Sequence, residues 1–404
     1  MSKNKFTEVK PDIETFAKIK VVGVGGSGGS AISRMVAAGL KGVEFLAINT
    51  DAQALHHVPS SKKIHIGKST TRGLGAGMDP DIGMKAAEES QEEIQDALKG
   101  ADMVFLTCGL GGGTGSGASP MIADLARESG ALTVGVVTKP FGFEGEQRRS
   151  IAESALGELE DKLDTIITIP NDKLLQIIDK KTSLLDSFKI VDEVLHQGVQ
   201  GISDLITIPG LINVDFADVK SVMENAGSSL MGIGTASGEN RAIEAAKAAV
   251  DSPLLDLSID GAKGILFTVT GGENLSMFEI NEAAKVITES ADTNARIIFG
   301  SVIDEKMEDE VKITVVATGF GKGQRSTKKV QAQAVSPFGA GAQKTADLTP
   351  DDEVQETPTI QVSNTAGFSK KDFSNQAPVN NTPEEADGSE EDLEIPAFIR
   401  KKMM

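Results

Sequence analysis

The 404-residue sequence contains no tryptophan and no tyrosine, and its single cysteine is Cys108. Without Trp and Tyr the chain lacks the rings on which bases and sugars usually stack, which disfavours an oligonucleotide or sugar groove. A lone thiol cannot form an internal disulfide, and a chain with almost no cysteine is typical of a reducing compartment. We therefore expect a cytoplasmic protein in which Cys108 is a small core residue.

Basic residues and long apolar runs are also scarce. Lys and Arg number 40 against 59 Asp and Glu, which gives a formal net charge of -19. Nucleic-acid affinity comes mainly from Lys and Arg that displace counterions, so DNA and RNA are not expected as partners. No run approaches the roughly 18 to 20 apolar residues of a membrane span, and the N-terminal MSKNKFTEVK lacks the apolar core of a signal peptide. Direct membrane insertion is therefore not expected.

Strands and helices alternate along the first half of the chain. Short β-branched runs predict strands at KIKVVGV, VEFLAIN, ADMVFLTCG and ALTVGVV, and the stretches MKAAEESQEEIQDALKG and MIADLARE between them have helical spacing. Such alternation predicts an α/β fold with a doubly wound parallel sheet. In that fold, ligands bind at the carboxyl ends of the strands.

The second half divides into a long helix, a smaller domain and a tail. Residues 184–206 predict one connecting helix, interrupted only by Gly198 and Gly201, and strands around the helix at 275–291 predict a second, smaller α/β domain. After Phe320 too few apolar residues remain to offset ordering entropy. We expect a flexible N-terminus 1–14, a nucleotide-binding domain 15–183, the helix 184–206, a second domain 207–320, a disordered linker 321–390 and a terminal peptide 391–404.

The terminal peptide combines an acidic cluster with an apolar patch. The patch is formed by Ile395, Pro396, Phe398 and Ile399 and is followed by basic residues. A short apolar patch on a long tether is typical of a partner-binding peptide, the alternative being a frayed tail.

The first glycine segment fits several motifs. Residues 23–28 satisfy GxGxxG, with Asp51 after the next strand, so a nicotinamide-dependent oxidoreductase is one possible function. Residues 25–29 also satisfy GxSxG, but no histidine with an acidic partner is identifiable for a serine nucleophile. Gly67-Lys68-Ser69 imitates a P-loop, yet Lys62 occupies the position of its first glycine.

The second glycine segment, GGGTGSG at 111–117, decides between these alternatives. Five glycines in seven positions allow several backbone N–H groups to turn towards one anion, and the helix that follows adds its dipole. A dinucleotide fold needs one such segment, whereas two at adjacent strand ends suit a nucleoside di- or triphosphate held from both sides. The sequence therefore predicts a phosphate cradle without a lysine.

GGGTGSG, between a strand and a helix, resembles the signature loop of the tubulin/FtsZ family of GTPases. Further similar stretches are NTDAQAL, TRGLGAG, TVGVVTKPF, IPNDKLL, QGVQGISDLI, NVDFADVK, SLMGIG and SGENRA, so the resemblance covers nearly all of residues 15–320. DLEIPAFIR resembles the family's C-terminal recognition peptide, which binds membrane-tethering partners. The chain is identified on these stretches as a member of the family and as a bacterial tubulin homologue.

The resemblance implies how GTP is bound. A carboxylate can accept the N1 and N2 protons of guanine, which adenine cannot offer together. The implied binding residues are Gly26, Ser27, Gly28, Gly29 and Ser30 around the phosphates, Gly113, Thr114 and Gly115 on the β and γ groups, Glu144 and Arg148 on sugar and phosphates, and Asn171 and Asp192 on guanine.

The resemblance also implies the catalytic residues. Asp215 and Asp218, three apart at a helix start, could order a water beside the γ-phosphate, while Mg²⁺ held mainly by phosphates and water offsets charge. Two acids at a helix start are by themselves more often N-terminal caps. In the family this loop reaches the nucleotide of the next subunit, so hydrolysis depends on head-to-tail polymerisation, which builds an open filament.

The implied role is assembly of the cytokinetic ring at the mid-cell division site. A scaffold that binds GTP without hydrolysing it is the alternative, and retention of Asp215 and Asp218 argues against it. One departure is that Gly29 and Ser30 stand where relatives commonly carry two asparagines, which removes two amide side chains near the phosphates.

Overall fold

The computed structural model describes residues 17–175, 182–208, 210–252, 259–304 and 307–320, which all lie in one compact unit. The predicted flexible N-terminus, the linker and the terminal peptide with Ile395, Pro396, Phe398 and Ile399 lie outside the described residues.

The first part of the fold is a six-stranded parallel sheet in the order β3-β2-β1-β4-β5-β6. Its strands are near-continuous apolar runs because both faces are covered, as parallel sheets require. The strands are β1 Ile19–Val24, β2 Val43–Asn49, β3 Lys62–His65, β4 Met103–Gly109, β5 Leu132–Lys139 and β6 Thr165–Pro170. The intervening helices are α1 Gly25–Ala37, α2 Ala52–His57, α3 Lys68–Thr71, α4 Pro80–Glu89, α5 Gln91–Leu98, α6 Gly113–Glu128, the 3-10 turn η1 Gly142–Glu144, α7 Glu146–Lys162, α8 Asn171–Leu174 and α9 Leu184–Thr207.

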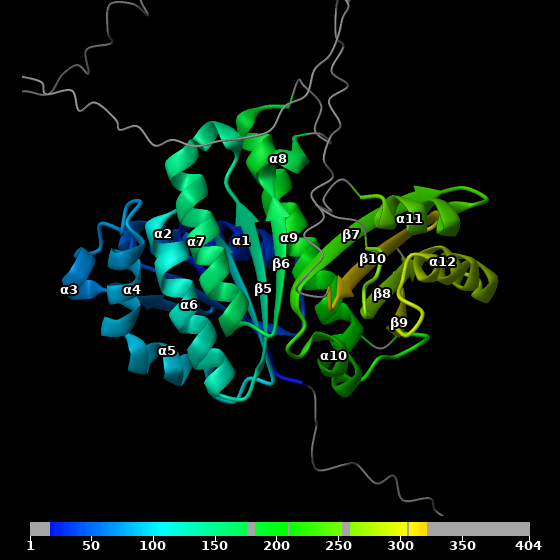
Figure 1. Cartoon of the computed structure of the whole chain (residues 1–404), viewed down its shortest axis with the longest axis horizontal. Coiled ribbons are helices and arrows are strands. Elements are labelled where there is room, and N and C mark those ends of the chain that lie inside the picture. Colours follow the sequence, from blue (N-terminus) through cyan, green and yellow to red (C-terminus); the bar gives the residue numbers. More distant parts are fainter. Residues whose placement is uncertain (1–16, 176–181, 209, 253–258, 305–306, 321–404) are drawn as a thin grey trace, which may run out of the picture. The chain divides into compact units, whose positions relative to one another are not determined.

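Helices cover both faces of this sheet (Figure 1). On one face Met35 of α1 and Leu195 of α9 belong to a core beneath the strands. On the other face Ile94, Ile122 and Leu159 bring α5, α6 and α7 into a second core, which also contains the fully buried Cys108. Burial raises the pKa of the Cys108 thiol to about 11, so this residue is an inert part of the core.

The second part continues the same sheet. Strand β7 (Gly227–Ser237) pairs in parallel with β6, and β10 (Glu310–Thr318), β8 (Gly264–Gly271) and β9 (Arg296–Ile303) follow, giving a ten-stranded sheet among the described residues. Helices α10 (Phe216–Met223), α11 (Arg241–Val250) and α12 (Met277–Glu289) accompany these strands. The predicted α/β class, parallel-dominated sheet and long helix are confirmed, and the second part is joined to the first edge to edge.

Several local predictions need correction. The helix predicted over 84–100 is two helices, because the chain breaks at Ser90, whose hydroxyl accepts the N–H of Gly67 at 3.3 Å. Strands β3, β6 and β7 were not predicted. Gly198 and Gly201 do not interrupt α9, which is continuous through both. A helix long and apolar enough for a bilayer is absent from the described part of the chain.

Candidate functional site

The first glycine segment is the N-terminus of a helix rather than a loop. Helix α1 begins at Gly25, directly after β1, and Gly25 takes a φ of +75° that favours glycine. No side chain caps the first turn, so its N–H groups are available to an anion. Gly26 and Ser27 are exposed there, and a side chain at Gly26 would meet open space.

The other predicted residues of this segment differ in exposure. Ser30 is exposed, whereas Gly28 and Gly29 are buried. A Cβ atom at Gly29 would lie 2.9 Å from Val58 Cγ2. A longer side chain at position 29 would therefore displace Val58, which is a physical reason for glycine where an asparagine was expected.

The second glycine segment is also a helix start. Helix α6 begins at Gly113, and its N-cap residue Gly112 offers no side-chain cap. Gly111 has a φ of +99°, and a Cβ atom there would lie 2.8 Å from the Arg148 carbonyl oxygen. Thr114 is buried with its hydroxyl 2.6 Å from that of Thr50, and Gly115 is buried beside it. The N–H of Gly113 already donates to Gly77 O at 2.9 Å, so it is not free for a phosphate.

The two helix starts lie side by side. The Gly109 N–H at the end of β4 donates to Ser27 Oγ at 2.7 Å, which joins the two segments directly. A Cβ atom at Gly25 would lie 3.2 Å from Gly115 N, so the backbones are in close contact. Two positive helix ends therefore converge at the carboxyl edge of the sheet, defined as the edge where β1, β4, β5 and β6 end.

Glu144 and Arg148 flank the second helix start. Their side chains form an ion pair with 3.3 Å between Arg148 Nη1 and Glu144 Oε2. Glu144 Oε1 also accepts the N–H of Phe141 at 2.9 Å, which fixes the carboxylate. The Arg148 guanidinium is about two-fifths exposed and can reach a ligand from this position.

Asn171 has an unused acceptor. It is the first residue of α8, directly after β6, and its side chain is 6 % exposed. The buried Oδ1 atom has no hydrogen-bond partner among the described residues. A buried acceptor without a donor is costly and rare, so a ligand that supplies an N–H group fits this atom.

The carboxylate of Asp192, on α9, is a second hydrogen-bond acceptor. Burial raises the pKa of Asp192 to about 6, although the Arg34 guanidinium acts in the opposite direction. No side chain or backbone donor among the described residues bonds to this carboxylate. Its desolvated oxygens therefore suit a ligand with two adjacent N–H donors.

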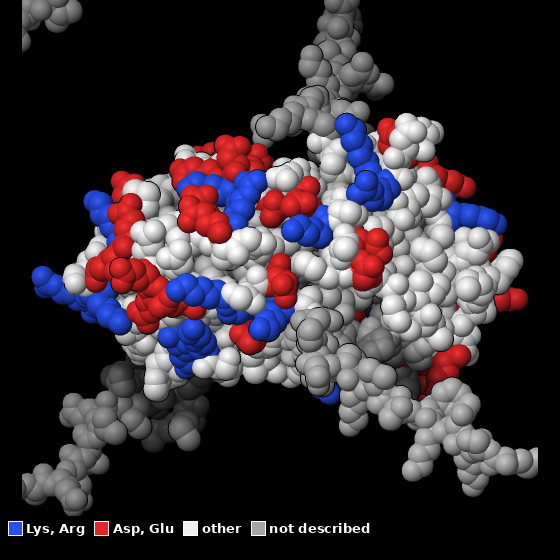
Figure 2. Space-filling model, turned by 90° about the horizontal axis from the view of Figure 1, so that it is seen from below, with Lys and Arg blue, Asp and Glu red and all other residues white. Residues whose placement is uncertain are grey.

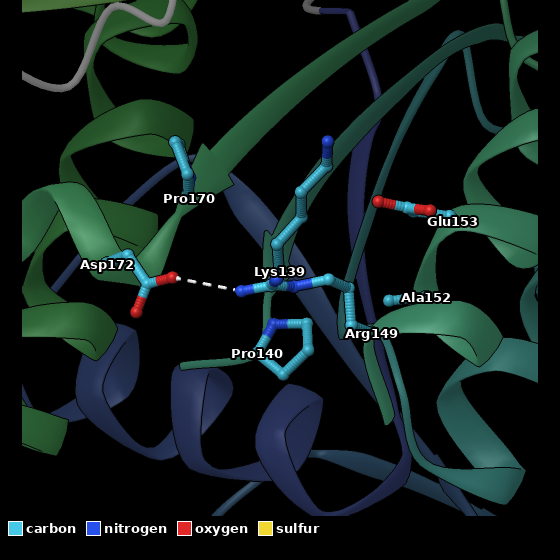
Figure 3. A pocket seen from close by; sticks show the side chains of 7 residues that line it. All are labelled: Lys139, Pro140, Arg149, Ala152, Glu153, Pro170 and Asp172. Carbon is cyan, nitrogen blue, oxygen red and sulfur yellow. Dashed lines mark ion pairs between the residues drawn. The ribbon is translucent and has the colours of Figure 1, made fainter. Parts of the chain in front are cut away.

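A small cavity that was not predicted is lined by Pro170 and Asp172, the residues before and after Asn171 in the chain (Figure 3). Its volume is about 80 Å³, and Arg149 points across it to Asp172, with 3.7 Å between Nη2 and Oδ2. Lys139 extends from the end of β5 towards the same space. Ligand pockets are usually about 300 to 1,000 Å³, so this cavity is too small for a nucleotide.

The two predicted catalytic aspartates, Asp215 and Asp218, called the acid pair below, lie away from the glycine segments. Asp215 is the N-cap of α10 and accepts the N–H of Asp218 at 2.8 Å, and both side chains are exposed. The far end of α10 bonds to Thr165, the first residue of β6, through Met223 O. Helix α10 is therefore at the amino edge of the sheet, opposite α8 and the two helices that start in the glycine segments, α1 and α6, called the glycine helices below (Figure 1). A single chain does not bring the acid pair and the glycine helices together.

The competing motifs in the first glycine segment have structural roles instead. Asp51, the acid of the nicotinamide motif, caps α2 by accepting the N–H of Ala54 at 2.9 Å. Ser27 in GxSxG bonds to Gly109, and no histidine of the described residues bonds to it. No group of three His, Cys, Asp or Glu side chains within the described ranges could hold a metal ion.

Comparison with known proteins identifies the family of the chain. Residues 18–179 match the GTPase domain of the tubulin/FtsZ family, and residues 227–321 match the C-terminal domain of the FtsZ family. An empty FtsZ dimer from M. jannaschii is similar, with 50% identity and a TM-score of 0.73 over 76% of this chain and 89% of that one. A mutant FtsZ from the same organism matches with 50% identity over 92% of its length. The GTPγS-bound CetZ2 protofilament of Haloferax volcanii, at 22% identity and a TM-score of 0.66 over 76% of this chain and 95% of that one, shows the fold alone.

This protein has a GTPase domain of the tubulin class. The fold, the glycine helices and the match of residues 18–179 to that domain all support this. More narrowly, the identity with the M. jannaschii chain and the second domain match mean that this chain belongs to the FtsZ family. The family resemblance predicted from the sequence is thus confirmed. The predicted bacterial source is not supported, because the two FtsZ structures come from an archaeon.

Proposed function

We propose that this protein binds and hydrolyses GTP and polymerises head to tail, with Asp215 and Asp218 of one subunit acting on the nucleotide of the next. The observation that carries this function is the separation of the acid pair from the glycine helices, which lie at opposite edges of one sheet. Stacked subunits with one orientation would bring the amino edge of one against the carboxyl edge of the next.

The binding half of the site suits a guanine nucleotide. Two converging helix starts offer N–H groups and positive dipole ends to phosphates, which replaces the lysine of other phosphate sites. The unpaired Asn171 Oδ1 and the desolvated Asp192 carboxylate offer acceptors to the N–H groups of guanine. Mg²⁺, when bound with the phosphates, would offset their charge. The GDP-bound CetZ1 and GTPγS-bound CetZ2 are relatives in fold with such ligands.

The acid pair divides into two roles. The Asp215 carboxylate accepts the N–H of Asp218 at 2.8 Å and so fixes the first turn of α10. The Asp218 carboxylate is exposed and has no hydrogen-bond donor among the described residues, so it can accept a proton-bearing water. A water held by Asp218 in line with the γ-phosphate of the neighbouring subunit is the nucleophile of the proposed reaction.

Head-to-tail contact of unlike faces builds an open filament. The lower face, which carries α10, has interspersed acidic and basic side chains on the left and few charges over much of the right (Figure 2). An area with few charges suits contact with another subunit. FtsZ of M. jannaschii forms a dimer and CetZ2 a protofilament, which supports self-assembly here.

The biological role follows from assembly. We propose that the filaments form the cytokinetic ring at mid-cell in the cytoplasm. The peptide with Ile395, Pro396, Phe398 and Ile399 would attach them to membrane-tethering and regulatory division proteins, without direct insertion of this chain into the membrane.

The dependence of turnover on protein concentration tests this function. Because each active site needs two subunits, phosphate release per subunit should be negligible at low concentration and rise steeply where polymer sediments with GTP. Sedimentation with GDP is the control. A turnover per subunit that is constant across the whole range would contradict the proposed function.

A further inference from the structure

The acid pair is carried by a short segment that cannot hold its own shape. Helix α10 has 8 residues, and helices of this length are marginal in water without tertiary contacts. Both acids are exposed, so burial of their side chains does not position them. The buried Val219, Val222 and Met223 hold one face of α10 against the core. How the exposed face with the two acids is oriented also depends on how the two ends of the segment, residues 210–223, are attached.

The C-terminal end is attached through three consecutive carbonyl groups. The last carbonyls of a helix have no partner within the helix. In α10, Arg296 Nη1 donates to Ser221 O at 2.9 Å, and Thr318 Oγ1 donates to Val222 O at 3.0 Å. Thr165 Oγ1 donates to Met223 O at 2.5 Å. Side chains from β9, β10 and β6 thus close the end of one helix.

The N-terminal end is attached to the same strand, β9. Leu211 N donates to Ser301 O at 3.0 Å, and Ser301 N donates to Ile212 O at 3.2 Å, which forms an isolated β-bridge. Asn213 Oδ1 accepts the N–H of Gly210 at 2.7 Å and closes the turn. Strand β9 therefore holds the segment before α10 through Ser301 and the end of α10 through Arg296.

We propose that Arg296 is a positioning residue for the acid pair, holding α10 at the angle at which Asp218 meets the neighbouring nucleotide. This inference rests on the proposed function of Asp215 and Asp218. Of the three side chains that close α10, Arg296 alone is charged and exposed, whereas Thr165 and Thr318 are buried in the sheet. Its cation lies at the negative end of the helix dipole, and a charged donor forms a stronger hydrogen bond than a hydroxyl.

The test compares Arg296→Met with Arg296→Lys in the full-length chain. Loss of the attachment should lower kcat for GTP about 10-fold, because small misplacements of catalytic groups cost large factors in rate. The KM for GTP and the mass of polymer sedimented should stay unchanged, since Arg296 is remote from the glycine helices. Lysine can reach the same carbonyl and should restore most of kcat. Lys285→Met removes another exposed cation, on α12, and should leave kcat unchanged.

A second variant checks the same attachment from another strand. Thr318→Val removes the hydroxyl that donates to Val222 O and should also lower kcat at constant KM. The inference is overturned if Arg296→Met hydrolyses GTP like the parent. It is also overturned if Arg296→Met and Arg296→Lys lose activity equally and in proportion to lost polymer. Asp218→Asn distinguishes a failure of the positioning role of Arg296 from a failure of the proposed function. Unchanged turnover in that variant would contradict the proposed function.

Discussion

At the residue scale, the two side chains proposed to bind guanine show what the sequence could not reveal. Family resemblance predicted Asn171 and Asp192 as ligands, but neither the unpaired Asn171 Oδ1 nor the desolvation of Asp192 follows from spacing along the chain. Both depend on how β6, α8 and α9 pack. Lys139 and Arg149 line the small cavity nearby, and no spacing in the sequence assigns a role to either.

The raised pKa of Asp192 predicts pH-dependent nucleotide binding. Guanine N–H groups require the ionised carboxylate, so affinity for GDP should fall as pH drops through about 6. Well below that pH the fall approaches about tenfold per unit. Asp192→Asn should bind GDP more weakly and should lose the pH dependence that comes from Asp192. GDP affinity is measured for both proteins between pH 5 and 8, and the difference between them excludes the titration of the nucleotide itself.

The stability of the nucleotide-free protein should depend on pH in the opposite direction from GDP affinity, and should fall as pH rises. Because the folded pKa of Asp192 exceeds its ordinary value, the folded nucleotide-free protein holds the proton more tightly than the unfolded chain. The resulting loss of stability develops as pH rises from about 4 to 6 and is complete above that range. Asp192→Asn should therefore be more stable than the parent at pH 7 but not at pH 4, and equal stability at both would contradict the assignment.

At the element scale, strongly periodic segments were predicted well, and short or glycine-rich ones were not. The helix expected at 184–206 is α9, Leu184–Thr207, because its apolar face persists over its whole length. Strand β3 has only 4 residues and β6 ends in Pro170, whereas the 11-residue β7 was missed because Gly227, Gly232 and Gly234 weaken its strand pattern. The glycine segments were predicted as loops, but packing of α1 against β1 and of α6 against α4 keeps residues 25–29 and 113–117 helical.

The uncapped start of α6 gives a direct prediction. Gly112 has extended backbone angles and open space around its missing Cβ, so an aspartate fits there. Asp is a favoured N-cap, and the nucleotide-free protein should be at least as stable with Gly112→Asp. The carboxylate would occupy the phosphate position, and GTP affinity should fall at least about 10-fold by charge repulsion. Gly112→Ala adds a side chain without charge and should keep most of the affinity in the same titration.

At the scale of the whole molecule, one sheet connects the two halves of the proposed site. Pairing of β6 with β7 fixes α10 at the amino edge while the glycine helices stay at the carboxyl edge. The sequence identified which residues resemble the family's site, whereas strand order and direction decide where they lie. The opposite placement of the two groups could therefore be predicted only through the family resemblance, and the topology now gives it a physical basis.

Complementation between two variants with different defects tests the shared site most directly. Asp218→Asn keeps the glycine helices but lacks an acid, and Gly112→Asp keeps the acids but binds GTP poorly. When mixed, Gly112→Asp subunits should supply Asp218 to GTP held by Asp218→Asn subunits, so phosphate release should exceed the sum of the separate proteins. Mixing Asp218→Asn with the variant that carries both Asp218→Asn and Gly112→Asp should give no increase in phosphate release. If the first mixture releases phosphate no faster than that sum, the two halves of the site do not come from different subunits.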